Sequence, residues 1–176
     1  MRRARILGAG ALVVALGFCG TGAWTYAQAR SDEGLSFGRE RDAALAEGRQ
    51  RLTVLNTLDA STRERAAAGV RAWRDASTGP LRTELGRTEP AVGASARATV
   101  TEAALTALDA RAGTAKLIAT VRVEVTPRGS AAPTTDRKRL EAVLTRTGED
   151  TWKVAALSAV PVVGAEESER KEGGDE

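Results

Sequence analysis

The sequence predicts an α+β protein in which one amino-terminal transmembrane helix precedes helices that pack on an antiparallel four-stranded sheet. Three observations lead to this prediction. Residues 6–29 are uncharged and mostly apolar, residues 36–88 space their apolar side chains by three and four, and residues 97–161 alternate apolar with polar. Spacing by three and four is typical of helices, and alternation is typical of half-buried strands. Because the helices precede the strands, the class is α+β.

The first element, residues 6–29, is long enough to cross a bilayer. About 20 helical residues span a hydrocarbon core about 30 Å thick. Cationic flanks remain cytoplasmic, and aromatic rings favour the membrane interface. The residues that indicate this topology are Arg2, Arg3, Arg5, Trp24 and Tyr26. We expect residues 1–5 in the cytoplasm and the following domain outside the plasma membrane.

Two alternatives for this leader remain open. The Ala27-Gln28-Ala29 sequence matches the small-x-small pattern of a signal-peptide cleavage site, although the apolar run exceeds the usual length of about 7–15 residues. Cys19 raises the alternative of lipoprotein processing, but Phe18 occupies a position where that processing requires a small residue. A retained anchor is the reading we carry forward.

Three helices are expected after the span. Residues 30–60 form a membrane-proximal segment that is helical to Leu58, with one apolar face. The residues of this face are Leu45, Gly48, Leu52, Leu55 and Leu58. A second helix begins at Ser61, which forms a capping box with Glu64, and runs to Asp75. Residues 81–88 form a short third helix.

Four strands are expected next, in an extracytoplasmic domain that covers residues 61–163. Short connections favour an antiparallel meander. The predicted strands cover residues 97–108, 117–126, 140–144 and 152–161, joined by a turn at 109–113, a loop at 127–136 and a tight turn at 148–150. Residues 164–176 are predicted to be a disordered acidic tail, because residues 165–176 contain six acidic and two basic side chains.

Composition excludes several function classes. The net charge of +3 comes from the three leading arginines, and the remainder has as many acidic as basic residues. A nucleic-acid-binding domain would show a basic excess. The chain has no His, and its one Cys lies in the span, so neither a His/Cys metal site nor a disulfide is expected. Arginine greatly outnumbers lysine, which suggests a high-GC actinobacterial source.

No residue pattern in the sequence indicates a catalytic site. Proton transfer near neutral pH usually uses His, which is absent, and a serine nucleophile needs a nearby base. Asp59, Asp75 and Asp109 lie at the ends of predicted elements, where Asp commonly caps or turns. We therefore expect no catalytic residues, no cofactor and no enzymatic activity.

The aromatic residues Trp73 and Trp152 are the candidates for a ligand pocket between the helices and the sheet. Such pockets are mostly apolar, but large aromatic residues also anchor cores. The full set of candidate pocket or core residues is Trp73, Trp152, Val121, Val123 and Leu144.

The layout resembles the Mce-associated membrane proteins of actinomycetes. The resemblance covers a basic start, one span and the segments Leu52-Thr53-Val54-Leu55, Ala76-Ser77-Thr78-Gly79, Ala119-Thr120-Val121 and Trp152-Lys153-Val154. It implies a curved, cone-like sheet of the nuclear-transport-factor-two-like and SnoaL-like type. It also implies an accessory role in an Mce-type importer of lipids or sterols, through protein partners and with a lipid as a conceivable ligand.

Two other functions remain open. A single span with a small cone domain also resembles the inner-membrane assembly component of type IV secretion and conjugation systems. The third reading is a cone domain that binds a small apolar ligand.

Overall fold

The structure is a computed structural model that describes residues 33–129, 131–148 and 151–160. The chain divides into two units after Glu40. The second unit, from Arg41 onward, contains the sheet and most of the helical residues, and the site lies within it. The predicted cytoplasmic segment, span and acidic tail lie outside the described residues, as do Arg2, Arg3, Arg5, Trp24 and Tyr26. None of the helices in the described ranges is both long and apolar enough to cross a membrane.

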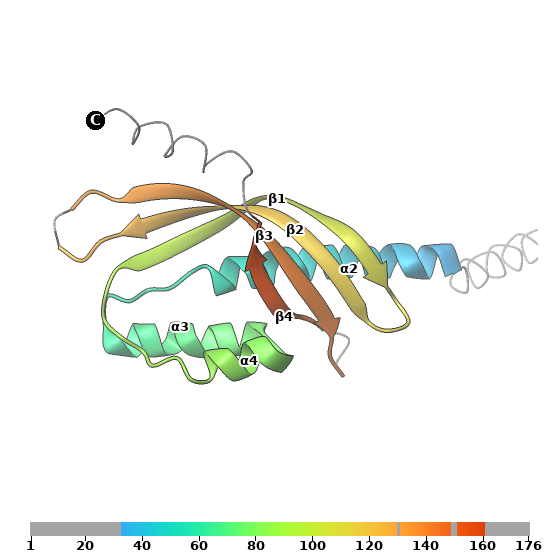
Figure 1. The fold of residues 1–176 in the computed structure, drawn as a ribbon, viewed down its shortest axis with the longest axis horizontal. Coiled ribbons are helices and arrows are strands. Elements are labelled where there is room, and N and C mark those ends of the chain that lie inside the picture. Colours follow the sequence, from blue (N-terminus) through green and yellow to red (C-terminus); the bar gives the residue numbers. More distant parts are fainter. Residues whose placement is uncertain (1–32, 130, 149–150, 161–176) are drawn as a thin grey trace, which may run out of the picture. The chain divides into compact units, whose positions relative to one another are not determined.

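The expected order of three helices and four strands is confirmed (Figure 1). The elements are α2 (Glu33–Leu55), α3 (Arg63–Ala76), α4 (Gly79–Leu85), β1 (Ser95–Asp109), β2 (Thr114–Thr126), β3 (Thr134–Arg146) and β4 (Trp152–Ala159). The sheet order is β1-β2-β3-β4, and each neighbouring pair is antiparallel, so the meander is also confirmed.

The start of α3 differs from the predicted capping box. Thr62, not Ser61, is the N-cap, and its hydroxyl oxygen accepts a hydrogen bond from the backbone N–H of Arg65 at 3.2 Å. The Ser61 hydroxyl instead donates to Asp59 at 2.6 Å. The prediction was wrong by one residue because the preceding aspartate, outside the box pattern, engages the serine.

The strands β1, β2 and β3 extend beyond the alternating stretches that predicted them, whereas β4 ends at Ala159, before the predicted end at residue 161. The first residues of β3 are polar on both faces and exposed, so alternation could not reveal them. The expected turn between β1 and β2 is confirmed. Asp109 Oδ1 accepts the N–H groups of Arg111 and Ala112, and Gly113 takes a positive φ of 63°.

The core lies between one face of the sheet and the helices. Its largest fully buried side chains are Trp152, Leu52, Leu117, Leu144, Val70, Val121 and Val154. Ala44 and Leu52 of α2 belong to the same cluster, so the compact unit includes residues before the predicted domain boundary at residue 61. The leucine spacing predicts that this helix has an apolar face. It does not reveal that this face packs on the sheet.

Gly48 allows α2 to approach the sheet closely. A Cβ at this position would lie 2.8 Å from Leu144 Cδ1 and 3.0 Å from Leu117 Cδ2. Both distances are shorter than ordinary carbon–carbon contact, so the absent side chain makes room for two core leucines. The glycine that weakens the helical pattern is thus explained by packing.

Candidate functional site

The segment between α2 and α3 is held against the start of β1. Leu58 and Ala96 exchange two backbone hydrogen bonds of 2.8 Å. The backbone N–H of Ala60 donates to the Ser95 hydroxyl oxygen at 3.0 Å. This connection is therefore hydrogen-bonded to β1, an edge strand of the sheet, which places residues 59–65 beside the start of that strand.

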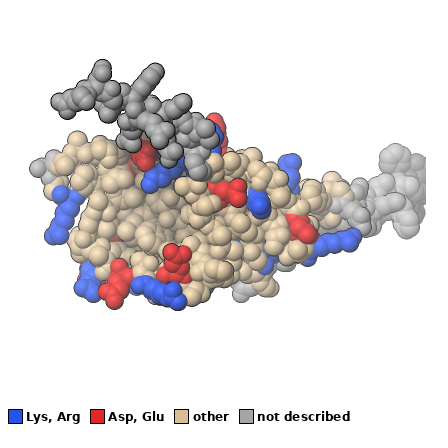
Figure 2. Space-filling model, in the orientation of Figure 1, with Lys and Arg blue, Asp and Glu red and all other residues tan. Residues whose placement is uncertain are grey.

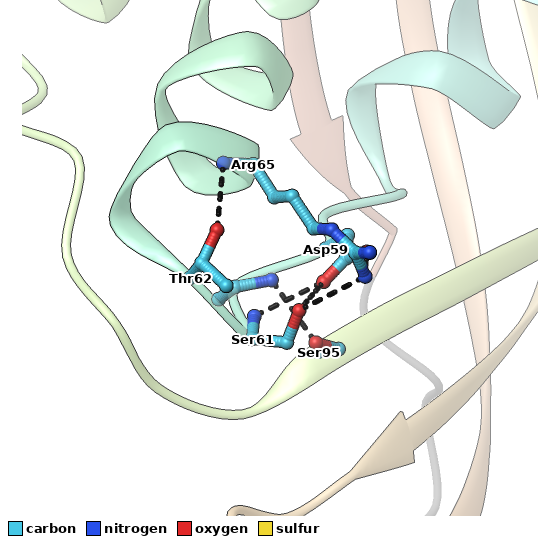
Figure 3. A network of polar contacts seen from close by, with 6 residues as sticks. Asp59, Ser61, Thr62, Arg65 and Ser95 are labelled. Atoms are coloured by element: carbon cyan, nitrogen blue, oxygen red, sulfur yellow. Dashed lines mark hydrogen bonds and ion pairs between the residues drawn. The ribbon is translucent and has the colours of Figure 1, made fainter.

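Asp59 is the centre of a polar network at this junction (Figure 3). Its Oδ1 accepts the Ser61 hydroxyl at 2.6 Å and the Ser61 backbone N–H at 3.0 Å. Its Oδ2 lies 3.1 Å from Arg65 Nη1. These hydrogen bonds from Ser61, with the nearby Arg65 guanidinium, hold the pKa of the Asp59 carboxyl below its ordinary value.

The Asp59–Arg65 pair lines two surface hollows. One has a volume of about 500 Å³ and is mostly apolar, with walls from the end of α2 and from α3. Its lining residues are Thr53, Val54, Thr57, Asp59, Arg65, Ala68, Gly69 and Ala72. The other, of about 300 Å³, is lined partly by Ser95, Ala96 and Arg97 of β1. Small side chains on α3 create the first hollow, because they leave space beside the last turn of α2.

Trp73 stabilises this junction from one side. Its indole Nε1 donates to the Thr57 carbonyl at 2.8 Å, and the Thr57 hydroxyl accepts the backbone N–H of Ala98 at 3.1 Å. Trp73 is half-buried and does not belong to the main core cluster. Trp73 therefore links α3 to the connection between α2 and α3. It is not among the residues that line the two hollows.

The other candidate pocket residues lie in the packed core. Trp152, Val121 and Leu144 are fully buried and Val123 nearly so, all in one cluster on the helix-facing side of the sheet. The structure does not bring Trp152 and Trp73 together in one site, because Trp73 lies outside that cluster. The hollows beside Asp59 are lined by other residues.

A second polar cluster, which the sequence reasoning did not identify, holds α2 on β4. The Glu47 carboxylate accepts the backbone N–H of Trp152 at 3.0 Å, and Arg51 Nε donates to the Trp152 carbonyl at 3.4 Å. Glu47 and Arg51 also pair at 3.6 Å. Residues four apart on a helix are neighbours, so the sequence could have indicated the Glu47–Arg51 ion pair. It does not indicate their contact with Trp152, which lies about one hundred residues away.

The chemistry available to these groups is limited. A carboxylate with a lowered pKa and with both oxygens engaged is a weak base near neutral pH. Within the described ranges, no three His, Cys, Asp or Glu side chains lie close enough to hold a metal ion. What the junction offers is a contact surface with an apolar hollow and a polar rim.

The visible surface has no large area of one charge. Figure 2 shows Lys and Arg side chains interspersed with Asp and Glu on this face. A mixed surface of this kind gives weak long-range attraction to polyanions. The arrangement agrees with the balanced composition of the domain.

No family model matches the chain, and no curated protein does either. Solved structures with a similar fold include CagV, a VirB8 homologue of the type IV secretion system of Helicobacter pylori. It has 8% identity and a TM-score of 0.53, and the match covers 69% of this chain and 98% of CagV. An IcmL-like type IV secretion system protein of Legionella pneumophila has 12% identity and a TM-score of 0.51, with 69% and 93% covered.

A third structure is an Ntf2-like protein involved in plasmid conjugation, with 12% identity and a TM-score of 0.49, covering 70% of this chain and 50% of that protein. The resemblance to the Mce-associated proteins receives no support from family models or curated proteins, since neither gives a match. At these identities the likeness concerns the backbone arrangement. The domain has the fold of the two type IV secretion proteins, with helices packed on a four-stranded antiparallel sheet.

Proposed function

We propose that this protein is a non-enzymatic assembly component of a type IV secretion or conjugation-like complex. Residues 6–29 anchor it in the plasma membrane, and the domain acts outside the membrane through contact with protein partners. The observation that carries the proposal is the fold shared with CagV and the IcmL-like protein over about two thirds of this chain.

The packing and the polar groups support a contact role. Trp152 and the surrounding aliphatic side chains fill the space between helices and sheet, where enzymes with a similar cone would need polar groups. The Asp59 carboxylate is engaged by Ser61 and Arg65 and is a poor proton acceptor near neutral pH. A domain with a hollowed junction suits the binding of a partner's side chains.

Crosslinking in intact cells tests the proposal. The full-length protein, tagged at its amino terminus, is crosslinked, solubilised and purified, and its partners are identified by mass spectrometry. We expect conjugation-type ATPases and channel subunits, enriched over an unrelated single-span protein that is tagged in the same way. Recovery of Mce subunits in their place would overturn the proposal and support the importer role.

The genomic neighbourhood gives an independent check. Genes for conjugation ATPases beside this gene would agree with the secretion role. Genes for Mce subunits in the same position would contradict it. The importer role rests on the sequence layout alone, so this observation distinguishes the two functions without any biochemical assay.

A further inference from the structure

The half of the β2–β3 hairpin that includes its loop carries an excess of positive charge. We call residues 122–139 the distal hairpin. Its charged side chains in the described ranges are Arg122, Glu124, Arg128, Asp136, Arg137, Lys138 and Arg139. Five are basic and two are acidic, and all seven are exposed. The balanced composition of the whole domain conceals this local excess.

Arg122 and Arg137 are direct cross-strand partners on the face of the sheet opposite the core. Directly opposed residues have Cβ atoms about 5 Å apart, and like charges in this position are destabilising. Neither arginine forms an ion pair with a described residue. Arg139 lies two positions further along the same face of β3 and is likewise without an acidic partner among the described residues.

No described acidic side chain forms an ion pair with Arg122, Arg137 or Arg139. Asp136 pairs with Lys138 at 4.0 Å. Glu124 lies opposite Arg97 on β1 and two positions from Arg122, and Glu141 lies two positions from Arg139. Neither of them, nor Glu102, forms an ion pair with a described residue. Arg122, Arg137 and Arg139 are therefore open to an acidic group from outside the described part of the domain.

The chain leaves the described structure beside this cluster. The backbone N–H of Val160 donates to the carbonyl of Arg139 at 2.9 Å, directly after the last residue of β4. Because β4 is antiparallel to β3, the chain at this point runs toward Arg137. Residues 134–138 have no partner strand on the β4 side within the described ranges.

The following segment has the complementary charge. Residues 165–176 contain six acidic and two basic side chains. The 16 residues after Val160 can extend about 50 Å at about 3.3 Å per residue. Both the starting point and the length thus allow the acidic side chains to reach the arginine cluster.

We propose that the acidic segment 165–176, which composition alone predicts to be disordered, binds the distal hairpin of its own chain through Arg122, Arg137 and Arg139. The bound segment neutralises the cross-strand arginine pair and covers the hairpin face. The proposal does not depend on whether the domain serves a secretion complex or an importer.

Distance measurement between spin labels tests this contact in the full-length chain. In a Cys19→Ser background, labels are placed at Thr135→Cys on the hairpin and Gly173→Cys in the segment. At low salt we expect a short, narrow distance distribution. Arg122→Ser with Arg137→Ser should broaden it and shift it to longer distances. Raising the salt from about 0.1 M to 1 M should do the same, because the Debye length falls from about 10 Å to about 3 Å.

The control removes two positive charges elsewhere. Arg87→Ser with Arg111→Ser changes two exposed arginines, one after α4 and one in the β1–β2 turn. This control should leave the distance distribution unchanged. A distribution that is broad in the parent chain, or that responds equally to both double changes, would overturn the proposal.

Peptide binding gives a second measurement that does not depend on the labels. A fluorescent peptide with the sequence of residues 165–176 is titrated into a chain that lacks those residues. We expect saturable binding that Arg122→Ser with Arg137→Ser weakens at least tenfold and that the control double change leaves within twofold. A peptide with Gln in place of its five glutamates and Asn in place of its one aspartate should not bind, and equal binding of this peptide would contradict the proposal. Absence of binding to the parent chain would contradict the proposed contact.

Discussion

At the scale of single residues, the two tryptophans of the domain have different roles. Trp152 is fully buried in the core, whereas Trp73 is half-buried and donates a hydrogen bond to the Thr57 carbonyl. The sequence predicts an apolar environment for both, because Trp73 lies in a helical apolar pattern and Trp152 begins an alternating one. Only the fold shows that Trp152 is a core residue, whereas Trp73 links α3 to the connection between α2 and α3.

Substitution should distinguish these roles. Trp152→Ala is expected to lower the free energy of unfolding by about 3–5 kcal/mol, because it removes a large buried ring and leaves a cavity. Trp73→Phe keeps most of the ring and loses one hydrogen bond, so a loss of about 0.5–1.5 kcal/mol is expected. Denaturant unfolding of both variants measures the difference. A loss under about 1 kcal/mol for Trp152→Ala would place that residue outside the core.

Asp59 predicts a dependence of stability on pH. Its folded-state pKa is lowered by hydrogen bonds from Ser61 and by Arg65, so its contribution is present above the unfolded pKa of about 3.9. That contribution is lost as the pH falls through the folded-state pKa. The difference in melting temperature between the parent and Asp59→Asn should therefore shrink as the pH drops below about 4. Glu102→Gln, on another face, is the control for loss of one carboxylate, and a constant difference for Asp59→Asn would contradict the assignment.

At the scale of secondary-structure elements, α2 is the helix whose placement controls the core. Ala44 and Leu52 are fully buried, and Glu47 and Arg51 bind the backbone of Trp152. The polar pair replaces hydrogen bonds that the first residue of β4 would otherwise make with water. One helix face thus supplies both apolar contact and backbone hydrogen bonds to a strand.

Two glycines in α2, one with open space beside it and one packed against the sheet, provide a test of this packing. Gly38→Ala should raise stability by up to about 1 kcal/mol, since nothing lies within 4 Å of the added Cβ and Ala favours the helix. Gly48→Leu should instead lower stability by about 1–3 kcal/mol, because its side chain meets Leu144 and Leu117. Thermal unfolding measures both changes. Equal stabilisation by both would show that α2 does not pack closely on the sheet.

At the scale of the whole molecule, we propose that an anchor at residues 6–29 determines where the domain acts. Residues 6–29 lie outside the described ranges, so their role rests on the length of the uncharged stretch and on the cationic residues before it. The shared fold with two secretion-system proteins concerns the domain that follows.

Cell fractionation tests the anchor. We expect the full-length protein in the membrane fraction, with its domain cut by protease added to protoplasts and protected in intact cells. Sequencing of the mature amino terminus provides the control. A mature chain that begins at Arg30 and is released into the medium would show that the leader is a cleaved signal peptide.

The order of helices and strands, the antiparallel meander and the turn at Asp109 follow from local patterns, because apolar period and turn chemistry act over a few residues. The first half of β3 could not be found in this way, since its side chains are polar on both faces and pairing with β2 alone defines it. Local patterns were also insufficient at the cap of α3, where Asp59 engages Ser61.

Contacts between distant residues account for the remaining features. The hollows beside Asp59 exist because α2, α3 and β1 meet at one junction, and Glu47 binds Trp152 across about one hundred residues. The cross-strand pair of Arg122 and Arg137 likewise depends on register. The amino-acid order specified which segments are helical or extended and which side chains are apolar. The folded arrangement established which charges face one another, because separation along the chain does not encode distance in space.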